Sequence, residues 1–401
     1  MADKIELIGL DKDEISALMT EIGEKPFRAK QLYQWLYVQG ATSFEQMTNL
    51  SKDLRAKLAD KFTITRPKIV AEQLSKDKTH KWLLEFADGQ RIETVYIPEA
   101  DRGSVCISTQ VGCAVGCTFC HTGSQKITRN LTAGEIVSQF MVVRDVYQEW
   151  PSTTGDNRMV SNIVVMGMGE PLHNVDNVVK ALQLLTDGDG IAISKRKVTL
   201  STSGIVPHMP RIAKETGVKL AVSLHAPNND KRSQIMPINK RYAIEEILQA
   251  CQEYQKIVTS RFITFEYLML DGINDSLDDA RQLIDLMKKF KIGAKFNLIP
   301  FNPWPGCPYQ PSSNNRVHAF SRELEKAGFA APIRVARGQD ILAACGQLKS
   351  KKLVLWVTST EIAGRKFPHV RLCTLRYFRL YFLLFTSFSE FFVCCILICT
   401  R

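Results

Sequence analysis

Residues 102–123 read RGSVCISTQVGCAVGCTFCHTG, an apolar run followed directly by three closely spaced cysteines. The run at 104–109 has the apolar, β-branched composition of a buried strand. The cysteines follow on a loop at C-x3-C-x2-C spacing: Cys113, Cys117 and Cys120. Three thiolates at this spacing can hold a four-iron cubane and leave one iron without a protein ligand. We therefore expect one 4Fe-4S cluster with a coordination position open to a small molecule.

A zinc site is the alternative interpretation of these cysteines. Three thiolates and the imidazole of His121 would supply the four ligands of a structural zinc ion. Such sites usually take paired cysteines from two separated segments, whereas the three thiols here share one short loop. The spacing favours the iron–sulfur cluster and leaves zinc as the open alternative.

Strand-like and helix-like segments alternate through the rest of the chain. Five further apolar runs cover residues 162–169, 197–204, 218–226, 262–272 and 294–303. Amphipathic stretches separate them, the first opening with a capping box at Thr132–Glu135 and the others covering 175–185, 207–215, 244–255, 277–290 and 313–327. This alternation is typical of parallel strands joined by right-handed crossovers. We expect an α/β fold in which six strands form a partial (β/α)6 barrel, with an open side suited to a large substrate.

Polar residues gather where each expected strand ends. They are Gly169-Glu170, Ser201-Thr202-Ser203, Ser223-Leu224-His225, Asp271 and Asn302. In parallel α/β folds, ligands bind at the carboxyl ends of the strands. We therefore expect these residues and the cysteine loop to surround one site, although a single serine at a strand end is more often a cap than a ligand.

The two ends of the chain depart from this pattern. Residues 1–90 show helical spacing at 13–22, 28–38 and 44–62, then strand alternation with a turn at Asp88-Gly89, which predicts a small accessory unit. Residues 351–401 hold ten of the 35 aromatic residues. Their apolar stretch approaches the length of a membrane span but contains Glu390, which is costly in a bilayer. We expect 349–401 to be a disordered or artefactual extension, with a membrane anchor as the less favoured interpretation.

Composition narrows the class of protein. The charged N-terminus has no apolar core, so we expect no signal peptide, a cytoplasmic location and no membrane contact. Eleven cysteines in such a chain indicate metal binding or thiol chemistry rather than a disulfide framework. Six of the eleven excess positive charges fall in residues 351–401. The remaining basic bias fits an RNA-binding surface but is weak support for one.

The cysteine spacing is the signature of the radical S-adenosylmethionine (SAM) superfamily, which this chain resembles closely. Further segments are similar to the RNA adenine methyltransferases of the RlmN/Cfr group, the RlmN family in particular. They are IETVYIP (92–98), MGMGEPL (166–172), STSG (201–204), SLHA (223–226), FNP (301–303) and RGQDILAACGQL (337–348). The resemblance runs to about Leu348. Members of the group usually end soon after the last motif, so the residues that follow here depart from the pattern of the group.

The resemblance implies an N-terminal accessory RNA-binding domain at 1–90 and a radical SAM methyltransferase core at 91–348. The cluster ligands would be Cys113, Cys117 and Cys120, and SAM would chelate the open iron. The residues that match SAM contacts in this group are Gly169, Glu170, Ser201, Ser223, Leu224, His225 and Asn302. The expected partners are RNA and an electron donor such as a flavodoxin-type reductant, and the expected state is a monomer.

The resemblance also implies the reaction, methylation of adenine C2 in 23S rRNA and in tRNA with two SAM per turnover. Cys345 would accept a methyl group from one SAM, and a radical made from the second SAM would remove a hydrogen from that methyl. The carbon radical would add to adenine C2 and tether the enzyme to RNA. Cys106 would then form a disulfide with Cys345 and release the base, while Glu93 would manage the C2 proton.

Without the resemblance, the residues alone predict ordinary structural roles for Cys106, Cys345 and Glu93. Cys106 lies in an apolar run and resembles a core cysteine. Cys345 lies in ILAACGQL, which has the composition of a packed helix, and Glu93 would ordinarily be a solvated carboxylate. Two other functions stay open: a Cfr-like methyltransferase acting on adenine C8, and a non-catalytic iron–sulfur or zinc RNA-binding protein.

Overall fold

The computed structural model describes residues 4–100, 102–152, 158–259 and 262–350. Residues 1–350 form one compact unit. The expectations for residues 351–401, an extension or a membrane anchor, lie outside the described part of the chain. Among the described residues, no helix has the length and apolar character that a bilayer crossing requires.

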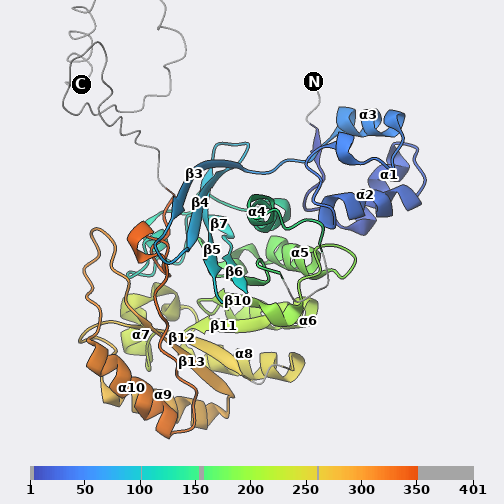
Figure 1. The fold of residues 1–401 in the computed structure, drawn as a ribbon. Helices are drawn as coiled ribbons and strands as arrows, with labels where there is room; N and C mark the ends of the chain where they lie inside the picture. Colours follow the sequence, from blue (N-terminus) through green and yellow to red (C-terminus); the bar gives the residue numbers. More distant parts are fainter. Residues whose placement is uncertain (1–3, 101, 153–157, 260–261, 351–401) are drawn as a thin grey trace, which may run out of the picture. The chain divides into compact units, whose positions relative to one another are not determined.

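Six neighbouring parallel strands form the greater part of a nine-stranded sheet (Figure 1). Their order in space is β6 (Gly103–Cys106), β9 (Asn162–Val165), β10 (Val198–Thr202), β11 (Lys219–Ser223), β12 (Ile263–Met269) and β13 (Ala294–Pro300). Chain order and spatial order agree, as right-handed crossovers between adjacent strands require. The edge strands of the sheet, β13 and β3, are not paired with each other in the described residues. The prediction of an open, six-stranded partial barrel is therefore confirmed.

Helices alternate with these strands as the amphipathic stretches predict, and the last of them follows β13. They are α4 (Ala133–Val146), α5 (Val175–Thr186), α6 (Met209–Thr216), α8 (Ile244–Ile257), α9 (Leu277–Phe290) and α10 (Asn314–Lys326). In α9, Leu283, Ile284 and Met287 are buried at helical spacing, which turns one apolar face toward the sheet. A further short helix, α7 (Asn229–Ile235), follows β11 and was not expected.

Three antiparallel strands extend the same sheet beyond β6. They are β3 (Lys68–Leu74), β4 (His80–Glu85) and β5 (Arg91–Pro98), and β5 pairs with β6. The expected turn at Asp88-Gly89 joins β4 and β5, with Gly89 at a φ of 76°. This hairpin and the parallel strands thus share one hydrogen-bonded sheet. The boundary expected at residue 90 therefore falls in the turn between the paired strands β4 and β5.

Three helices precede the sheet: α1 (Lys12–Glu21), α2 (Phe27–Tyr37) and α3 (Lys52–Lys61). The first two match the predicted segments, whereas the predicted helix at 44–62 is wrong in its first half. A short 3-10 turn occupies Phe44–Gln46, and α3 begins only after Ser51. The Ser51 side chain accepts a hydrogen bond from Leu54 N, and this cap fixes the start of the helix.

A glycine contact fastens the N-terminal segment to the barrel. A Cβ added at Gly134, near the start of α4, would overlap the carbonyl oxygen of Ile8. Ion pairs reinforce the contact, with Lys12 Nζ 3.0 Å from Asp187 Oδ2 on the loop after α5. The N-terminal helices are therefore held against α4 and α5 by backbone proximity and by charge.

We expect Gly134→Ala to lower the free energy of unfolding by about 1–3 kcal/mol, the usual cost of overpacking. Alanine would ordinarily stabilise a helix, but here the backbone of Ile8 would have to move. Gly188→Ala is the control, because a Cβ at Gly188 meets nothing within 4 Å. Denaturant unfolding of both variants measures the difference, and equal stabilities would contradict the close approach.

Candidate active site

The cysteine loop is closed at its base by two short strands. β7 (Gln110–Val111) pairs with β8 (Arg129–Asn130), so the loop leaves and returns at one point of the barrel rim. Thr118 N donates to Ile235 O at 3.0 Å, which joins the loop to the end of α7. The loop is therefore held at its base and at its middle.

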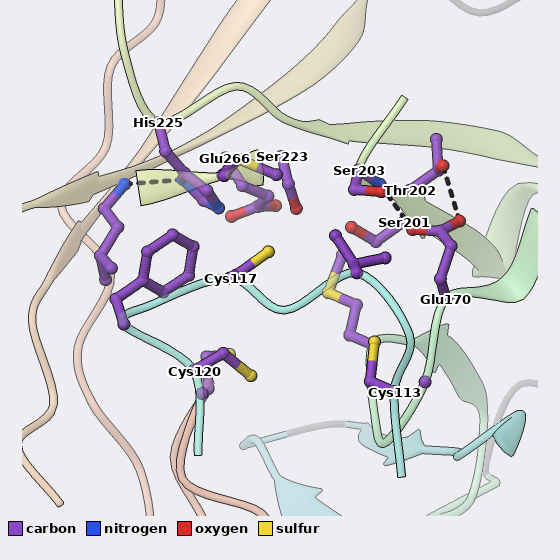
Figure 2. A pocket seen from close by; sticks show the side chains of 18 of the residues that line it. Cys113, Cys117, Cys120, Glu170, Ser201, Thr202, Ser203, Ser223, His225 and Glu266 are labelled. Atoms are coloured by element: carbon purple, nitrogen blue, oxygen red, sulfur yellow. Dashed lines mark hydrogen bonds between the residues drawn. The ribbon is translucent and has the colours of Figure 1, made fainter. Parts of the chain in front are cut away.

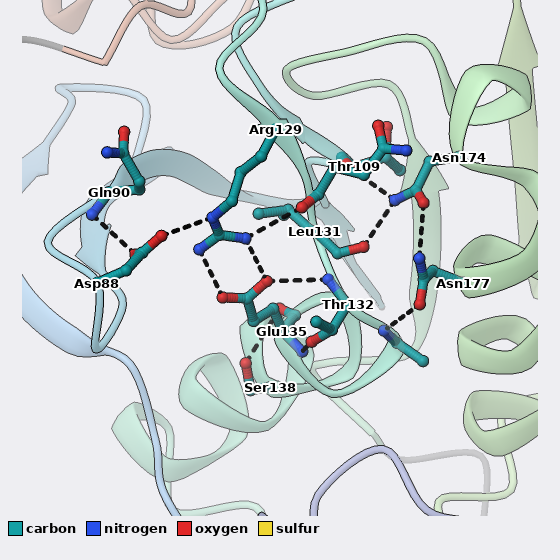
Figure 3. A network of polar contacts seen from close by, with 12 residues as sticks. Asp88, Gln90, Thr109, Arg129, Leu131, Thr132, Glu135, Ser138, Asn174 and Asn177 are labelled. Atoms are coloured by element: carbon teal, nitrogen blue, oxygen red, sulfur yellow. Dashed lines mark hydrogen bonds and ion pairs between the residues drawn. The ribbon is translucent and has the colours of Figure 1, made fainter.

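An ion-pair network fixes the exit of this loop (Figure 3). The guanidinium of Arg129 binds both carboxylate oxygens of Glu135 at 2.7 and 2.8 Å and reaches Asp88 Oδ2 at 2.6 Å. Glu135 also accepts from Thr132 N at 2.9 Å, which confirms the predicted capping box of α4. Because the fork is bidentate, it sets the direction of the chain between the loop and the helix.

All three predicted cluster ligands line one cavity, whose free volume is about 930 Å³ with the open solvent at its mouth included. Figure 2 shows the side chains of Cys113, Cys117 and Cys120 on one side of it, facing the polar ends of the strands. Burial raises the pKa of Cys113 to about 12 and also raises the pKa values of Cys117 and Cys120. Thiols in such surroundings become thiolates when a bound metal stabilises the charge.

The arrangement of the thiols fits a cluster better than a single ion. Among residues 4–350, gaps aside, no three His, Cys, Asp or Glu side chains converge on one metal position. In a cubane each thiolate binds a different iron, so the thiols stand apart around a shared space. The Nδ1–H of His121 donates to Gln347 O at 3.2 Å, and its ring stacks on Trp304. In the described part of the chain, His121 and the three thiols do not converge as the ligands of one zinc ion would.

The opposite wall of the cavity is built from the strand ends. Glu170 is buried, and its carboxylate accepts hydrogen bonds from Thr202 Oγ1 and Ser203 N, both at 2.7 Å (Figure 2). Gly169 has a φ of 98°, and a Cβ there would lie 2.5 Å from Gln110 Cβ. Gln110 thus packs directly against Gly169, and the neighbouring Glu170 presents a carboxylate fixed by two hydrogen bonds, which suits an ammonium group.

His225 takes a defined neutral form in this wall. Its Nδ1 accepts a hydrogen bond from Leu268 N at 3.0 Å, so the proton resides on Nε2. Burial and the nearby charge of Arg232 lower the pKa of His225 to about 3. The imidazole is therefore an uncharged donor. Ser201 and Ser223 line the same cavity, as expected.

One residue of this wall, Glu266, was missed by sequence reasoning. It lines the cavity together with the expected Ser203, and its carboxylate accepts a hydrogen bond from Asn297 Nδ2 at 2.8 Å. Burial raises the pKa of Glu266. A carboxylate within the otherwise apolar run at 262–272 was the available signal, because a charged residue in a buried strand needs a partner.

A second cavity of about 1340 Å³ adjoins the first. Its lining includes the predicted residues Cys106 and Asn302 and three cations, Lys295, Arg334 and Arg337. Cys345 lines both cavities, as Met166 and Ile299 also do. The fold thus places Cys345 at the boundary between the cluster cavity and a basic cavity that contains Cys106.

The two catalytic cysteine candidates have different surroundings. Cys106 is buried in β6, and both burial and the nearby Cys345 raise its pKa. Cys345 is solvent-accessible within the cavities, yet surrounding protein raises its pKa, Glu266 adds to this and Arg334 opposes it. The composition of ILAACGQL (341–348) predicted a packed helix, and this prediction is wrong. The nearest helical element is a 3-10 turn at Gln339–Ile341, which ends where the segment begins.

The loop that carries Cys345 is fastened at both ends. Before it, Lys81 Nζ donates to Leu342 O at 3.2 Å, and after it, Lys349 N donates to Glu93 Oε2 at 2.8 Å. Lys81 and Glu93 form an ion pair of 3.0 Å on the paired strands β4 and β5. The Lys81–Glu93 ion pair thus holds both ends of the Cys345 loop, and we call it the clamp.

Five residues predicted at the site are not among those that line the cluster cavity: Glu93, Cys106, Leu224, Asp271 and Asn302. Cys106 lines the second cavity, and Asp271 forms an exposed ion pair with Arg316 at 2.9 Å. Glu93 is only 7% exposed and is not among the described residues lining either cavity, so its interpretation as a solvated carboxylate is wrong. Asn302 lines the second cavity, where its Nδ2 donates to Cys345 O at 3.4 Å. Leu224 is fully buried in the core, and its carbonyl accepts from Arg232 Nε.

We expect Lys81→Met to reduce the free energy of unfolding by about 3–5 kcal/mol, because Glu93 would keep a buried charge without its ion-pair partner. Arg281→Met is the control, since Arg281 pairs with Glu323 near solvent and such pairs contribute about 0–1 kcal/mol. Thermal or denaturant unfolding gives both values. Equal, small losses would show that the clamp does not stabilise the fold.

Comparison with known proteins agrees with this geometry. The family model described as "Ribosomal RNA large subunit methyltransferase N-terminal domain" matches residues 5–64, and the radical SAM superfamily model matches 107–287. A crystal structure of a radical SAM methyltransferase from Sphaerobacter thermophilus is similar, with a TM-score of 0.81 and 42% identity. The similarity covers 86% of this chain and 100% of that one.

Relatives named "Dual-specificity RNA methyltransferase RlmN" match almost the whole described chain. The protein from Gluconobacter oxydans is 57% identical over 349 residues, covering 86% of this chain and 85% of its own length. That from Acidiphilium cryptum is 56% identical over 349 residues, covering 86% and 89%. The chain belongs to the RlmN family of the radical SAM superfamily.

Proposed function

We propose that this radical SAM RNA methyltransferase methylates C2 of adenine in 23S rRNA and in tRNA through a methylated cysteine. The position of Cys345 is the observation that carries the proposal. Its side chain lines both the cavity that holds the three cluster thiols and the basic cavity that contains Cys106. A methyl carrier must reach its methyl source and its acceptor base, and this position lets one side chain face both.

The cofactor residues divide between the two walls of the first cavity. Cys113, Cys117 and Cys120 would hold the cluster, and the opposite wall would bind SAM. When bound, the cluster and SAM supply one-electron chemistry and the methyl group. Glu170 would attract the ammonium of SAM, while His225 would donate a hydrogen bond from Nε2 without adding charge. Gly169, Ser201 and Ser223 line the same cavity, and Leu224 and Asn302, which lie outside its lining, complete the proposed SAM contacts.

The remaining site residues act on the methyl carrier and the base. Cys345 would accept the methyl through its thiolate. Once one carbon links the Cys345 sulfur to adenine C2, the thiolate of Cys106 would attack that sulfur. The S–S bond of a disulfide then forms as the S–C bond breaks, and the released carbon takes up a proton to become the methyl group of the base. Glu93 would receive the adenine C2 proton. The Glu93 carboxylate is held next to the Cys345 loop, because it accepts a hydrogen bond from Lys349 N at the end of that loop.

The second cavity has the charge expected of an RNA-binding surface. Lys295, Arg334 and Arg337 line it, and a target adenine that leaves its stack would bring phosphates to the rim. Helix α2 adds an exposed aromatic and a cation at its start, Phe27 and Arg28, with the guanidinium 4.8 Å from the ring centre. Exposed aromatic and basic groups together are typical of contacts to looped RNA.

The further properties of the proposal follow from the family. We propose an accessory RNA-binding domain at 1–90, supported by the match at 5–64, a core at 91–348 and an extension at 349–401. The proposed electron donor is a flavodoxin-type protein, and the proposed enzyme is a cytoplasmic monomer. A reducing compartment suits a chain whose seven described cysteines are all free.

Two measurements test the function. Anaerobically purified protein should be brown, with the broad visible absorbance of a cubane cluster, and should cleave SAM when reduced. Mass spectrometry of rRNA and tRNA from a deletion strain should show loss of 2-methyladenine, and the gene should restore it. Loss of 8-methyladenine instead would identify the Cfr-like activity. A colourless zinc protein that leaves SAM intact would refute the enzyme.

A further inference from the structure

Arg232 is a buried cation next to the cluster cavity. It lies on α7 and is 0% exposed. Its guanidinium donates to Leu224 O at 3.1 Å, Ser203 O at 2.7 Å, Ser223 O at 3.0 Å and Asn239 Oδ1 at 2.9 Å. All four acceptors are neutral. Within the described residues no carboxylate forms an ion pair with Arg232, which distinguishes it from paired cations such as Arg129 and Lys81.

Such a charge is costly unless an anion compensates it. A buried ion loses several kcal/mol of solvation, and carbonyl dipoles return only part of this. Burial lowers the pKa of Arg232 to about 10, so the guanidinium stays protonated at neutral pH. The fold therefore keeps a full positive charge at this position.

The neighbouring groups indicate which anion compensates it. Arg232 donates to the carbonyls of Ser203 and Ser223, two residues that line the same cavity as Cys117 and the other two thiols. The same helix reaches the cysteine loop directly, where Ile235 O accepts from Thr118 N. Arg232 is thus bonded to the wall of the cavity in which three thiolates would bring negative charge to the cluster.

We propose that Arg232 is the fixed counter-charge of the cluster and raises its reduction potential. The inference rests on the proposed function, in which Cys117 and the other two thiols hold a 4Fe-4S cluster. On reduction the cluster accepts one electron from a one-electron donor, of the flavodoxin class in the cell, and no bond forms or breaks. The added negative charge is stabilised by a guanidinium that water does not screen.

The hydrogen bonds of Arg232 give it a second effect on the same site. Ser203 comes directly after β10, and Ser223 is the last residue of the neighbouring strand β11. Both line the cluster cavity. One guanidinium binds both of their carbonyls. Charge and geometry are therefore separable, because a lysine keeps the charge while a glutamine keeps only hydrogen-bonding capacity.

The test is a redox titration of the reconstituted full-length protein with dithionite, followed by electron paramagnetic resonance of the reduced cluster. Arg232→Gln should lower the ratio of reduced to oxidised cluster at a fixed potential by tenfold or more, which is about 59 mV for one electron. Arg232→Lys should stay within about threefold of the unmodified protein. SAM cleavage rates are recorded in parallel but do not decide the outcome.

Arg144→Gln is the matched control. Arg144 is 1% exposed, donates to the neutral acceptors Glu149 O and Ser152 Oγ, and lies on α4. Its loss should destabilise the fold comparably and leave the potential unchanged. Equal potentials for the Arg232→Gln and Arg144→Gln proteins would overturn the proposal, as would an equal shift in Arg232→Lys.

Asn239→Asp keeps the test decisive if Arg232→Gln fails to fold. It places a carboxylate where Asn239 Oδ1 now accepts from Arg232 Nη1, and so neutralises the guanidinium without removing it. The potential should fall, and an unchanged potential would overturn the counter-charge. A failure of the proposed function is distinct, because the unmodified protein would then show no cubane signal at all.

Discussion

Cys345→Ala is expected to lower RNA methylation by about 10³-fold or more, as removal of a covalent nucleophile commonly does. The side chain lines both cavities, and alanine offers no sulfur to carry a methyl group between them. The cluster should remain, because its three thiols lie on a different loop. Mass spectrometry of the RNA product and the visible spectrum of the protein measure the two effects together.

Cys251→Ala is the control for the loss of a thiol. Cys251 is fully buried in α8 and lines neither cavity among the described residues. We expect its methylation activity to stay within about threefold of the unmodified enzyme. Full activity of the Cys345→Ala protein would refute a methyl carrier at this position, whatever the state of the cluster.

Cys106→Ala is expected to trap a covalent complex between enzyme and RNA. Without the second thiol, nothing attacks the Cys345 sulfur, so the carbon bridge from that sulfur to the base persists. Cys106 and Cys345 line one cavity, and the nearby Cys345 raises the pKa of Cys106. A band that is shifted on denaturing gels and removed by ribonuclease measures the adduct, which should become the main product of a single turnover.

The double variant Cys106→Ala with Cys345→Ala separates this adduct from unspecific cross-linking. It should give no shifted band, because the bridging sulfur is absent. Free RNA as the only product of the single Cys106→Ala variant would remove Cys106 from its proposed role. Methylated, released RNA from that variant would do the same, since another group would then resolve the bridge.

Local sequence signals were sufficient for most secondary structure. The capping box at Thr132–Glu135, the turn at Asp88-Gly89 and the periodicity of α9 each depend on residues close in the chain. The error at 44–62 has the same origin. Apolar spacing continues through this segment, but Ser51 caps a helix that starts inside it. A capping hydrogen bond outweighed the pattern there.

The site was predictable where its residues share a short segment or a strand end. Cys113, Cys117 and Cys120 needed only their spacing, and Ser201 and Ser223 needed only the rule that parallel strands end at one rim. Glu93 shows the limit of this reasoning. The strand that carries Glu93 was predicted correctly. The burial of its side chain, however, depends on Lys81 of the neighbouring strand β4 and on Lys349, far along the chain.

The sequence by itself determined the cysteine loop, the alternation of strands and helices and the rim where they end, because these follow from contacts within one segment. Only the tertiary structure decided that Cys345 and Cys106 line one basic cavity and that Arg232 is buried with no carboxylate partner among the described residues. Such features arise when distant segments pack together. Burial and electric field are properties of that packing, and no single segment of the chain encodes them.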